Sequence, residues 1–544
     1  MQTDRRAAAL MIGASAALAL APWPRQSSAA APVPLASEPW AVSHHKERPV
    51  RGGILRVAAP LYIGSMNPNR WPVHDWFTMG LIHDRLFLND GSYLPSAHWL
   101  AESMVQETAT AVLLTLRPGV RFHDGSPMTA VGVKRQIDWI RDPDSGTWSA
   151  FMLRPLESVE AIGPLQLRFT FKEPWASFAG VMASVPGFVL PEAALGSDND
   201  RFNAHPIGSG PYIVEEANPG NFLKLKRNPD WWLAKAVGRP DMPYFDGVHI
   251  AVIPDPGVRL ANFRAGKLDV MQLAKSQYPL MMGDRRANVY VEPLPITTML
   301  RFNSARGACA DIRVRKAIGH AIDRKALLAS TQHGLGRIAS GLFPGDHWAH
   351  DPALAPMRYD PALARELLAQ AGHGNGLTIT GYMHNSPPSQ TLAGAIRAML
   401  RNVGVTWQVD LLAPTAMSAR YEQGGFDLAY NPSSWIYDPD IQATGGYQPG
   451  GIGARFRTLD PDLVAMIDAA RTEMRFAQRQ ALYHAIEGKI VEDHLNVYLW
   501  WEESATAMQK YVRGFDPAME IAHGEAWTYS HSLWFEHGRP GKPG

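Results

Sequence analysis

The chain has very little cysteine: Cys309 is the single one among 544 residues. One cysteine excludes an intramolecular disulfide bond. No cysteine stands near the start of the chain, where a lipid could be attached. Because no histidine motif accompanies Cys309, we interpret it as a small loop residue and not as a nucleophile.

The sequence also lacks a surplus of either charge. Lysine and arginine total 52, aspartate and glutamate 51, and the formal net charge is +1. Nucleic-acid binding usually needs a basic surplus, so the charge balance gives no support to a nucleic-acid partner. A composition of 46% hydrophobic and 19% charged residues is that of a globular protein. The length predicts about two to four domains.

No apolar run is long enough for a membrane span. The longest, Ala7–Ala21, follows Arg5 and Arg6 and ends in the small residues Ser28–Ala30. A span needs roughly twenty residues. The pattern therefore predicts a signal peptide over residues 1–30, with Sec or twin-arginine export left open. Several prolines over residues 31–49 predict a flexible leader.

The usual enzyme signatures are missing as well. The chain contains neither Gly-x-Ser-x-Gly nor His-Glu-x-x-His. His123-Asp124 stands beside Gly125 and is interpreted as a turn. The best metal candidate is the pair His347 and His350, with acidic neighbours, but we interpret them as incidental histidines on a surface loop. We expect no enzyme activity, no cofactor and no bound metal.

What is present is an alternation of short strands and amphipathic helices, an α/β pattern. Period-two alternation predicts strands over residues 165–171 and 405–411. Apolar residues at helical spacing predict helices from Asp311 and over residues 391–403, the second closed by Gly404. The run 497–501 predicts a buried strand that ends at Glu502-Glu503. The segment Gly208–Pro211 is interpreted as a structural turn.

Four segments in a fixed order resemble the bacterial extracellular solute-binding protein family 5, the peptide and nickel binders of ABC importers. They read LRPGVRFHDG (116–125), PIGSGPY (206–212), RNPDWW (227–232) and FN followed by DIRVRKAI and AIDR (302–324). The resemblance implies a two-lobed periplasmic-binding-protein fold, type II in its large three-domain variant, with a hinged ligand cleft.

The resemblance also implies domain boundaries. Lobe I would comprise residues 50–85, 205–303 and 500–544, the last including the C-terminal tail. An inserted domain would span 86–204 and lobe II 304–499.

Ligand-facing residues follow from the same resemblance. Aromatic walls and a few fixed polar groups are typical of such clefts. The candidates are Trp71, His74, Trp148, Asn303, Trp435, Tyr437 and Asp438.

Asp438 has two interpretations. Peptide binders of the family carry GW-x-x-D-x-x-DP here, and the first aspartate pairs with the peptide ammonium group. In this chain Asp438 lies three residues after Trp435 but directly precedes Pro439. It is either the ammonium partner, or it is the later aspartate of the motif, a turn residue before Pro439, and the ammonium partner is missing. In both cases we expect its substitution to leave the fold intact.

The resemblance predicts a monomeric periplasmic protein that captures a short peptide or peptide-like solute and delivers it to ABC permease subunits in the inner membrane. Alternative cargoes are a nickel chelate, a sugar or an opine. A secreted hydrolase is the less favoured alternative, because nucleophile motifs are missing.

Overall fold

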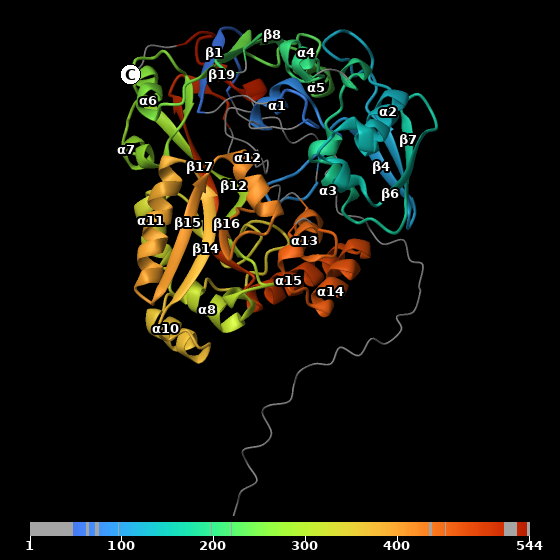
Figure 1. Ribbon diagram of the computed structural model, residues 1–544. Helices are drawn as coiled ribbons and strands as arrows, with labels where there is room; N and C mark the ends of the chain where they lie inside the picture. The colour runs from blue at the N-terminus through green and yellow to red at the C-terminus, as the bar shows by residue number, and fades with distance from the viewer. Residues whose placement is uncertain are drawn as a thin grey trace, which may run out of the picture.

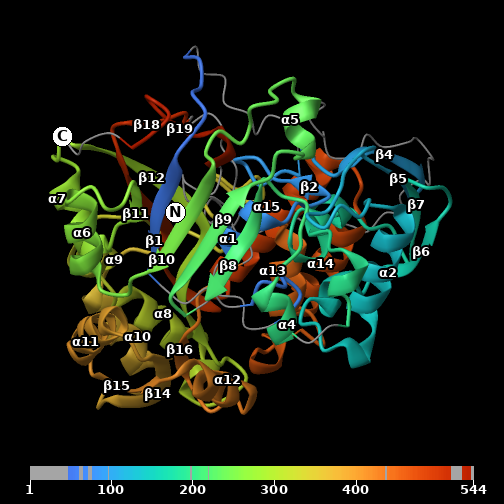
Figure 2. The ribbon, with the colours of Figure 1, turned by 90° about the horizontal axis from the view of Figure 1, so that it is seen from above.

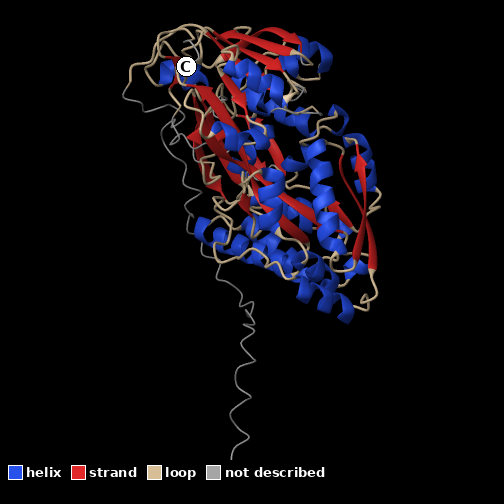
Figure 3. Cartoon of the chain, turned by 90° about the vertical axis from the view of Figure 1, so that its left-hand side faces the viewer, coloured by secondary structure: helices blue, strands red, loops and turns tan. Residues whose placement is uncertain are grey.

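The computed structural model describes residues 47–60, 65–70, 76–95, 97–196, 199–218, 220–434, 438–451, 453–515 and 530–540. The predicted signal peptide and most of the predicted leader lie outside this part of the chain. Figure 3 shows strands and helices running through the whole molecule, as the α/β pattern predicts. Within the described part, no helix combines the length and apolar character needed to cross a membrane.

The largest sheet in the described residues has nine strands. In spatial order they are β16 (Leu428–Tyr430), β12 (Ala287–Phe302), β17 (Asn496–Gln509), β11 (Val270–Gln272), β1 (Ile54–Ala59), β10 (Gly247–Val252), β9 (Phe222–Arg227) and β8 (Tyr212–Asn218), with β13 (Arg337–Ile338) beside β17. Strand β1 runs parallel to β10 and β11, and the other pairs are antiparallel. Figure 2 shows β1, β10, β9 and β8 side by side. Helices near this sheet are α1 (Trp76–Ile82), α4 (Asn199–Ala204), α5 (Trp232–Ala236), α6 (Pro256–Arg264) and α7 (Tyr278–Met281).

Strands β12 and β17 form the longest ladder. Its register shifts between Pro293 and Thr297 and again between Thr298 and Met299. Pro293 and Pro295 lack the N–H that a ladder needs. The prediction that Glu502-Glu503 ends the last strand is wrong, because β17 continues to Gln509. Glu502 stays in the sheet because its carboxylate accepts hydrogen bonds from Thr298 (2.5 Å) and the Trp500 indole (2.7 Å).

A second, four-stranded antiparallel sheet forms what we call the small-sheet region, residues 86–204. Its order is β4 (Ala101–Thr108), β5 (Ala111–Leu116), β7 (Gln166–Phe171) and β6 (Leu156–Ala161), with β2 (Phe87–Leu88) and β3 (Ala97–His98) pairing nearby. Helix α2 (Ala130–Arg141) buries Val133, Ile137 and Ile140, and Thr129 caps it by accepting the Gly132 N–H. Figure 1 shows this region beside the rest of the molecule, with α3 (Phe178–Met182) turned toward α13.

The remaining chain builds two further bodies. Parallel strands β14 (Leu377–His384) and β15 (Val405–Leu412) pack with α8 (Ile312–His320), α9 (Arg324–Gln332), α10 (Pro361–Gln370), α11 (Pro387–Arg401) and α12 (Pro414–Glu422). Asp311 caps α8 and Gly404 has a φ of +86°, as the sequence indicates. What we call the helical region comprises α13 (Pro439–Tyr447), α14 (Pro461–Thr472) and α15 (Phe476–Glu492). A short pair, β18 (Val512–Arg513) and β19 (Trp534–Phe535), lies near the C-terminus.

One buried carboxylate joins the small-sheet region to the large sheet. Asp84 is 3% exposed and accepts hydrogen bonds from the indoles of Trp99 (2.8 Å), Trp232 (2.8 Å) and Trp231 (3.4 Å). It also accepts one from the Ser209 hydroxyl at 3.1 Å. Burial raises the pKa of Asp84 to about 6, against the hydrogen bonds that stabilise its ionised form. Four donors from three distant segments therefore meet at one side chain.

The Gly208–Pro211 segment is the structural turn that the sequence predicts. Gly210 N–H donates to the Ile82 carbonyl at 2.8 Å. A Cβ atom at Gly208 would overlap the same carbonyl oxygen. His123 N–H donates to the Gly208 carbonyl at 2.8 Å, which ties the predicted His123-Asp124 turn to this segment.

Substitution Asp84→Asn is expected to destabilise the protein. The asparagine amide keeps one acceptor oxygen, but its N–H₂ group replaces the other oxygen and faces indole N–H donors. Those buried indole N–H groups then lack an acceptor, which lowers the free energy of unfolding by about 1–3 kcal/mol. Urea unfolding of the mature protein measures the change in the free energy of unfolding. The exposed Asp144→Asn serves as control. Equal stability of Asp84→Asn and wild type would show that the carboxylate does not hold this junction.

Candidate functional site

The Trp148 segment lies against the loop that follows β1. The Trp148 indole N–H donates to the Pro68 carbonyl at 3.0 Å, and its backbone N–H donates to the Asn69 carbonyl at 3.3 Å. The Ser149 hydroxyl donates to the Asn69 side chain at 2.7 Å. These bonds fix the start of a short 3-10 helix, Ala150–Leu153, beside the β1 loop.

Asp438 is buried and begins helix α13. Its Oδ1 accepts the Asp440 backbone N–H at 2.9 Å, and Pro439 occupies the first helical position. The Arg479 guanidinium, on α15, donates to the same oxygen at 2.6 Å. Both residues are nearly inaccessible, at 3% and 1% exposure. Burial lowers the pKa of Arg479, but the charge of Asp438 outweighs it and the net direction is upward.

This geometry corrects one expectation. The sequence-based view that Asp438 can be substituted without effect on the fold is wrong, because its carboxylate compensates a buried guanidinium. The local geometry is that of the second interpretation, an aspartate that caps the helix starting at Pro439. A role for Asp438 toward a ligand ammonium group stays a prediction.

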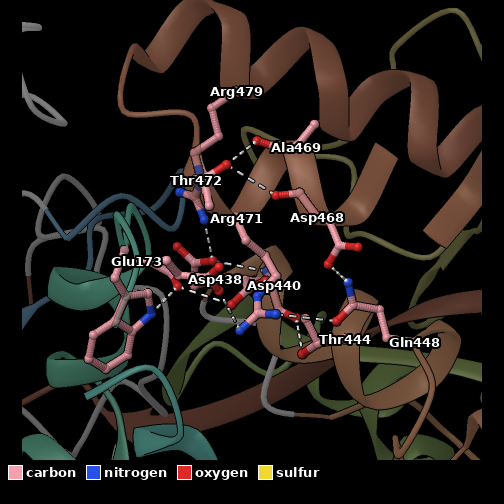
Figure 4. A network of polar contacts seen from close by, with 12 residues as sticks. Glu173, Asp438, Asp440, Thr444, Gln448, Asp468, Ala469, Arg471, Thr472 and Arg479 are labelled. Carbon is pink, nitrogen blue, oxygen red and sulfur yellow. Dashed lines mark hydrogen bonds and ion pairs between the residues drawn. The ribbon is translucent and has the colours of Figure 1, made fainter. Parts of the chain in front are cut away.

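Asp440 and Arg471 form a second, looser pair beside the first. The Ser177 hydroxyl donates to Asp440 Oδ2 at 3.1 Å and itself accepts the Trp175 indole N–H at 2.7 Å. Arg471 Nε lies 3.4 Å from Asp440 Oδ1, and Glu173 lies 3.8 Å from the same guanidinium. Figure 4 shows the two aspartates side by side, with Arg479 and Arg471 reaching them from α15 and α14. Polar contacts thus join the small-sheet region to the helical region.

A cavity of about 200 Å³ opens where these segments meet. One wall comes from the small-sheet region, the other from α13, the turn after it and α14. The lining residues are Phe151, Met152, Arg154, Pro155, Val181, Asp440, Ile441, Thr444, Gly445, Gln448, Pro449, Gly450, Gly451 and Arg471. The cavity combines apolar walls with charges of both signs, as small-molecule sites do.

The described residues place the other sequence candidates as follows. Asn303, 3% exposed, donates to the Gly424 carbonyl at 3.2 Å and accepts from Ala305 N–H at 3.3 Å. It holds the end of β12 and does not line the cavity. Trp71, His74, Trp435 and Tyr437 lie outside the described residues. Trp148 and Asp438 do not line the cavity themselves, but Phe151 and Asp440, close behind them in the chain, do.

The histidine pair is not on a surface loop, which corrects that expectation. His347 and His350 are 3% and 8% exposed. His350 Nδ1 lies 3.0 Å from the buried Glu487 carboxylate. Among the described residues no group of three metal-ligating side chains comes together. Cys309 is likewise buried, and burial raises the pKa of its thiol to about 12.

Sequence reasoning missed Asp440, Arg471 and Ser177. The one available signal was the repeated aspartate in Asp438-Pro439-Asp440. Nothing local marks Ser177, which lies 263 positions from its partner Asp440.

Solved structures with the same architecture are solute-binding proteins. NikZ from Campylobacter jejuni, solved with Ni(L-His), superposes with a TM-score of 0.75 at 21% identity, over 88% of this chain and 99% of its own. The oligopeptide-binding protein AppA from Bacillus subtilis, solved with a nonapeptide, gives 0.75 at 20% identity, over 90% and 100%. The fold is therefore that of the family 5 substrate-binding proteins, as predicted.

The family pattern described as bacterial extracellular solute-binding proteins, family 5 Middle, matches residues 97–452, and the chain belongs to this family. It is 26% identical to the glutathione-binding protein GsiB of Pectobacterium atrosepticum over 417 residues, 74% of this chain and 79% of that protein. The protein is thus an ABC-transporter substrate-binding protein and not an enzyme.

Substitution Arg479→Met is expected to lower the free energy of unfolding by about 3–5 kcal/mol, because it leaves the Asp438 carboxylate buried without its partner. Arg475→Met, at the N-cap of the helix that carries Arg479, is the matched control. Arg475 pairs with Glu473 at the surface, where such pairs contribute about 0–1 kcal/mol. Chemical denaturation followed by circular dichroism measures both. Similar losses in the two variants would contradict a special role for the buried pair.

Proposed function

We propose that the protein captures a short peptide or a peptide-like solute in the periplasm and delivers it to ABC permease subunits of the inner membrane. The observation that carries the proposal is the cavity lined by both Asp440 and Arg471. A peptide-like solute bears an ammonium group and a carboxylate, which need receptors of opposite charge. One relative is named as a glutathione-binding protein, and two of the similar structures contain a nonapeptide or Ni(L-His). All three ligands are built from amino acids.

The architecture supports a hinged two-lobe division. We propose lobe I over residues 50–85, 205–303 and 500–544, the inserted domain over 86–204 and lobe II over 304–499. Most strands of the proposed lobe I belong to the large sheet, and the small sheet lies within the proposed inserted domain. We keep Trp71, His74, Trp435 and Tyr437, which lie outside the described residues, with Trp148, Asn303 and Asp438 as the proposed ligand contacts. Export by an N-terminal signal peptide and a monomeric state complete the proposal.

The alternative cargo is a nickel chelate. NikZ, solved with Ni(L-His), shares the fold, and histidine itself carries the ammonium and carboxylate groups discussed above. No cluster of metal-ligating side chains forms among the described residues, so such a chelate would be recognised through its organic part. A neutral sugar would use the same cavity with fewer charged contacts, whereas an opine, which is an amino-acid conjugate, would keep them.

Isothermal titration calorimetry on the mature protein tests the proposal. Purified protein is unfolded and refolded to release bound ligand, then titrated with glutathione, trialanine, Ni(L-His) and a neutral disaccharide. The proposal expects saturable binding of at least one peptide and none of the disaccharide. Binding of the disaccharide alone would overturn the peptide assignment and leave the family membership intact.

Closure of the lobes around ligand is expected to reduce the radius of gyration in solution scattering and to shift tryptophan emission, because Trp148 lies three residues before Phe151, which lines the cavity. Trp148→Phe should keep the change in scattering and lose part of the change in emission. A ligand that binds tightly by calorimetry while scattering and emission both stay constant would contradict the hinge.

A further inference from the structure

Two parts of the small-sheet region contact the proposed lobe II. The first comprises residues 173–180, which lead into α3 and pack on the start of α13. A Cβ atom at Gly180 would lie 2.9 Å from both the Cβ and the Oδ2 atoms of Asp438. The backbone of α3 therefore lies directly against Asp438, at a distance that suits glycine alone.

Polar contacts flank this close approach. The Ser177 hydroxyl donates to Asp440 at 3.1 Å, and the Ala176 backbone N–H donates to the Arg471 carbonyl at 3.2 Å. The Arg471 guanidinium also lies 3.8 Å from Glu173 (Figure 4). One short segment of the small-sheet region thus contacts both α13 and α14.

The second part is the tip of the β2–β3 hairpin. Tyr93 is 1% exposed and belongs to the same apolar cluster as Phe343 and Trp348. Its ring stacks on that of His347, with 4.9 Å between the ring centroids. The Trp348 backbone N–H donates to the Ser92 carbonyl at 3.2 Å. The hairpin tip is therefore buried in the apolar cluster of the helical region.

The backbone of Tyr93 has an uncommon conformation. Its φ of +67° is in the left-handed region, which few residues other than glycine, asparagine and aspartate adopt. Such a conformation persists where the surrounding contacts hold it, and these positions cluster at functional segments. For Tyr93 the surrounding contacts include His347 and Trp348, which belong to the proposed lobe II.

We propose that these two contacts form a closure latch, in which residues 173–180 and Tyr93 hold the proposed inserted domain against the proposed lobe II. The inference rests on the proposed function, because it uses the division into lobes. Every contact of the closure latch joins two groups of the chain itself, so it favours closure whatever the ligand is. Contacts that exist only in the closed state raise its population. The ligand-free protein is then a mixture of open and closed molecules.

The closure latch contributes the same factor to the affinity for every ligand. When only the closed state binds tightly, the apparent Kd is the intrinsic Kd divided by the fraction of closed protein. Neither Tyr93 nor Gly180 lines the cavity. The cavity residues therefore determine which ligand is preferred, whereas the closure latch changes the affinity for all ligands together.

The substitution Gly180→Ala tests the closure latch without disturbing α3. Alanine favours a helix more than glycine does, but its Cβ atom would overlap Asp438. Gly394→Ala on α11 is the matched control, because a Cβ atom there meets nothing within 4 Å. Wild type and both variants are compared without ligand at pH 7.5, by hydrogen exchange and by solution scattering.

The backbone amides of Ala176 and Trp348 report on the two ends of the closure latch. Gly180→Ala is expected to lower the exchange protection of both amides roughly tenfold or more and to increase the radius of gyration. Separation of the lobes exposes the distant Trp348 amide together with that of Ala176. Gly394→Ala should match wild type. Unchanged protection of both amides, or a loss confined to Ala176, would overturn the closure latch and leave only a local packing contact.

Tyr93→Asn tests the same proposal from the hairpin tip. Asparagine adopts a positive φ readily but lacks the aromatic ring. The variant is expected to keep the far-UV circular dichroism of wild type and to lower the exchange protection of the Ala176 amide. It should also weaken the binding of glutathione and of trialanine by one common factor, roughly tenfold. Factors that differ more than about threefold between the two peptides would indicate that Tyr93 contacts ligand and would overturn its assignment to the closure latch.

The outcomes for the closure latch and for the proposed function are distinguishable. Exchange and scattering need no ligand, so a failure of both peptides to bind would overturn the peptide assignment while the two amides still test the closure latch. Equal protection in wild type, Gly180→Ala and Tyr93→Asn would overturn the closure latch, and binding of either peptide would then still support the proposed function.

Discussion

The buried ion pair between Asp438 and Arg479 ties the start of helix α13 to helix α15, beside the cavity. Through one oxygen, Asp438 both holds the guanidinium and starts helix α13. The next carboxylate along the chain, Asp440, lines the cavity and has a looser partner, Arg471. A tight ion pair and a looser one therefore lie side by side at this interface.

Another buried carboxylate, Asp84, holds the junction of the two sheets. Asp84 collects the indoles of Trp99, Trp231 and Trp232 in a dry environment. Its contacts position the small-sheet region relative to the large sheet. The small-sheet region in turn contacts the helical region through Ser177 and Glu173. The position of one cavity wall therefore depends on a carboxylate that touches no part of the cavity.

Local features of the sequence predicted local structure well. Asp311 and Gly404 each predicted a helix boundary, because caps and positive φ angles depend on nearby backbone. The family and fold followed from motifs of a few residues. The site did not, since the decisive pairs join residues far apart: 41 positions separate Asp438 from Arg479 and 263 separate Ser177 from Asp440. The prediction that the strand ends at Glu502 was wrong for a similar reason, because one of its two hydrogen-bond partners, Thr298, lies on another strand.

The interrupted ladder between β12 and β17 has a mechanical consequence. Over most of their length the two strands are joined by regular pairs, which resist bending out of the sheet. Between Pro293 and Thr297 the register shifts, and the prolines supply no N–H. If the two ends of the ladder rotate relative to each other, fewer hydrogen bonds are stretched in this segment than in the rest of the ladder. The longest ribbon of the large sheet thus has a compliant point at a fixed place, where bending strain concentrates and the stiffer segments on either side move as units.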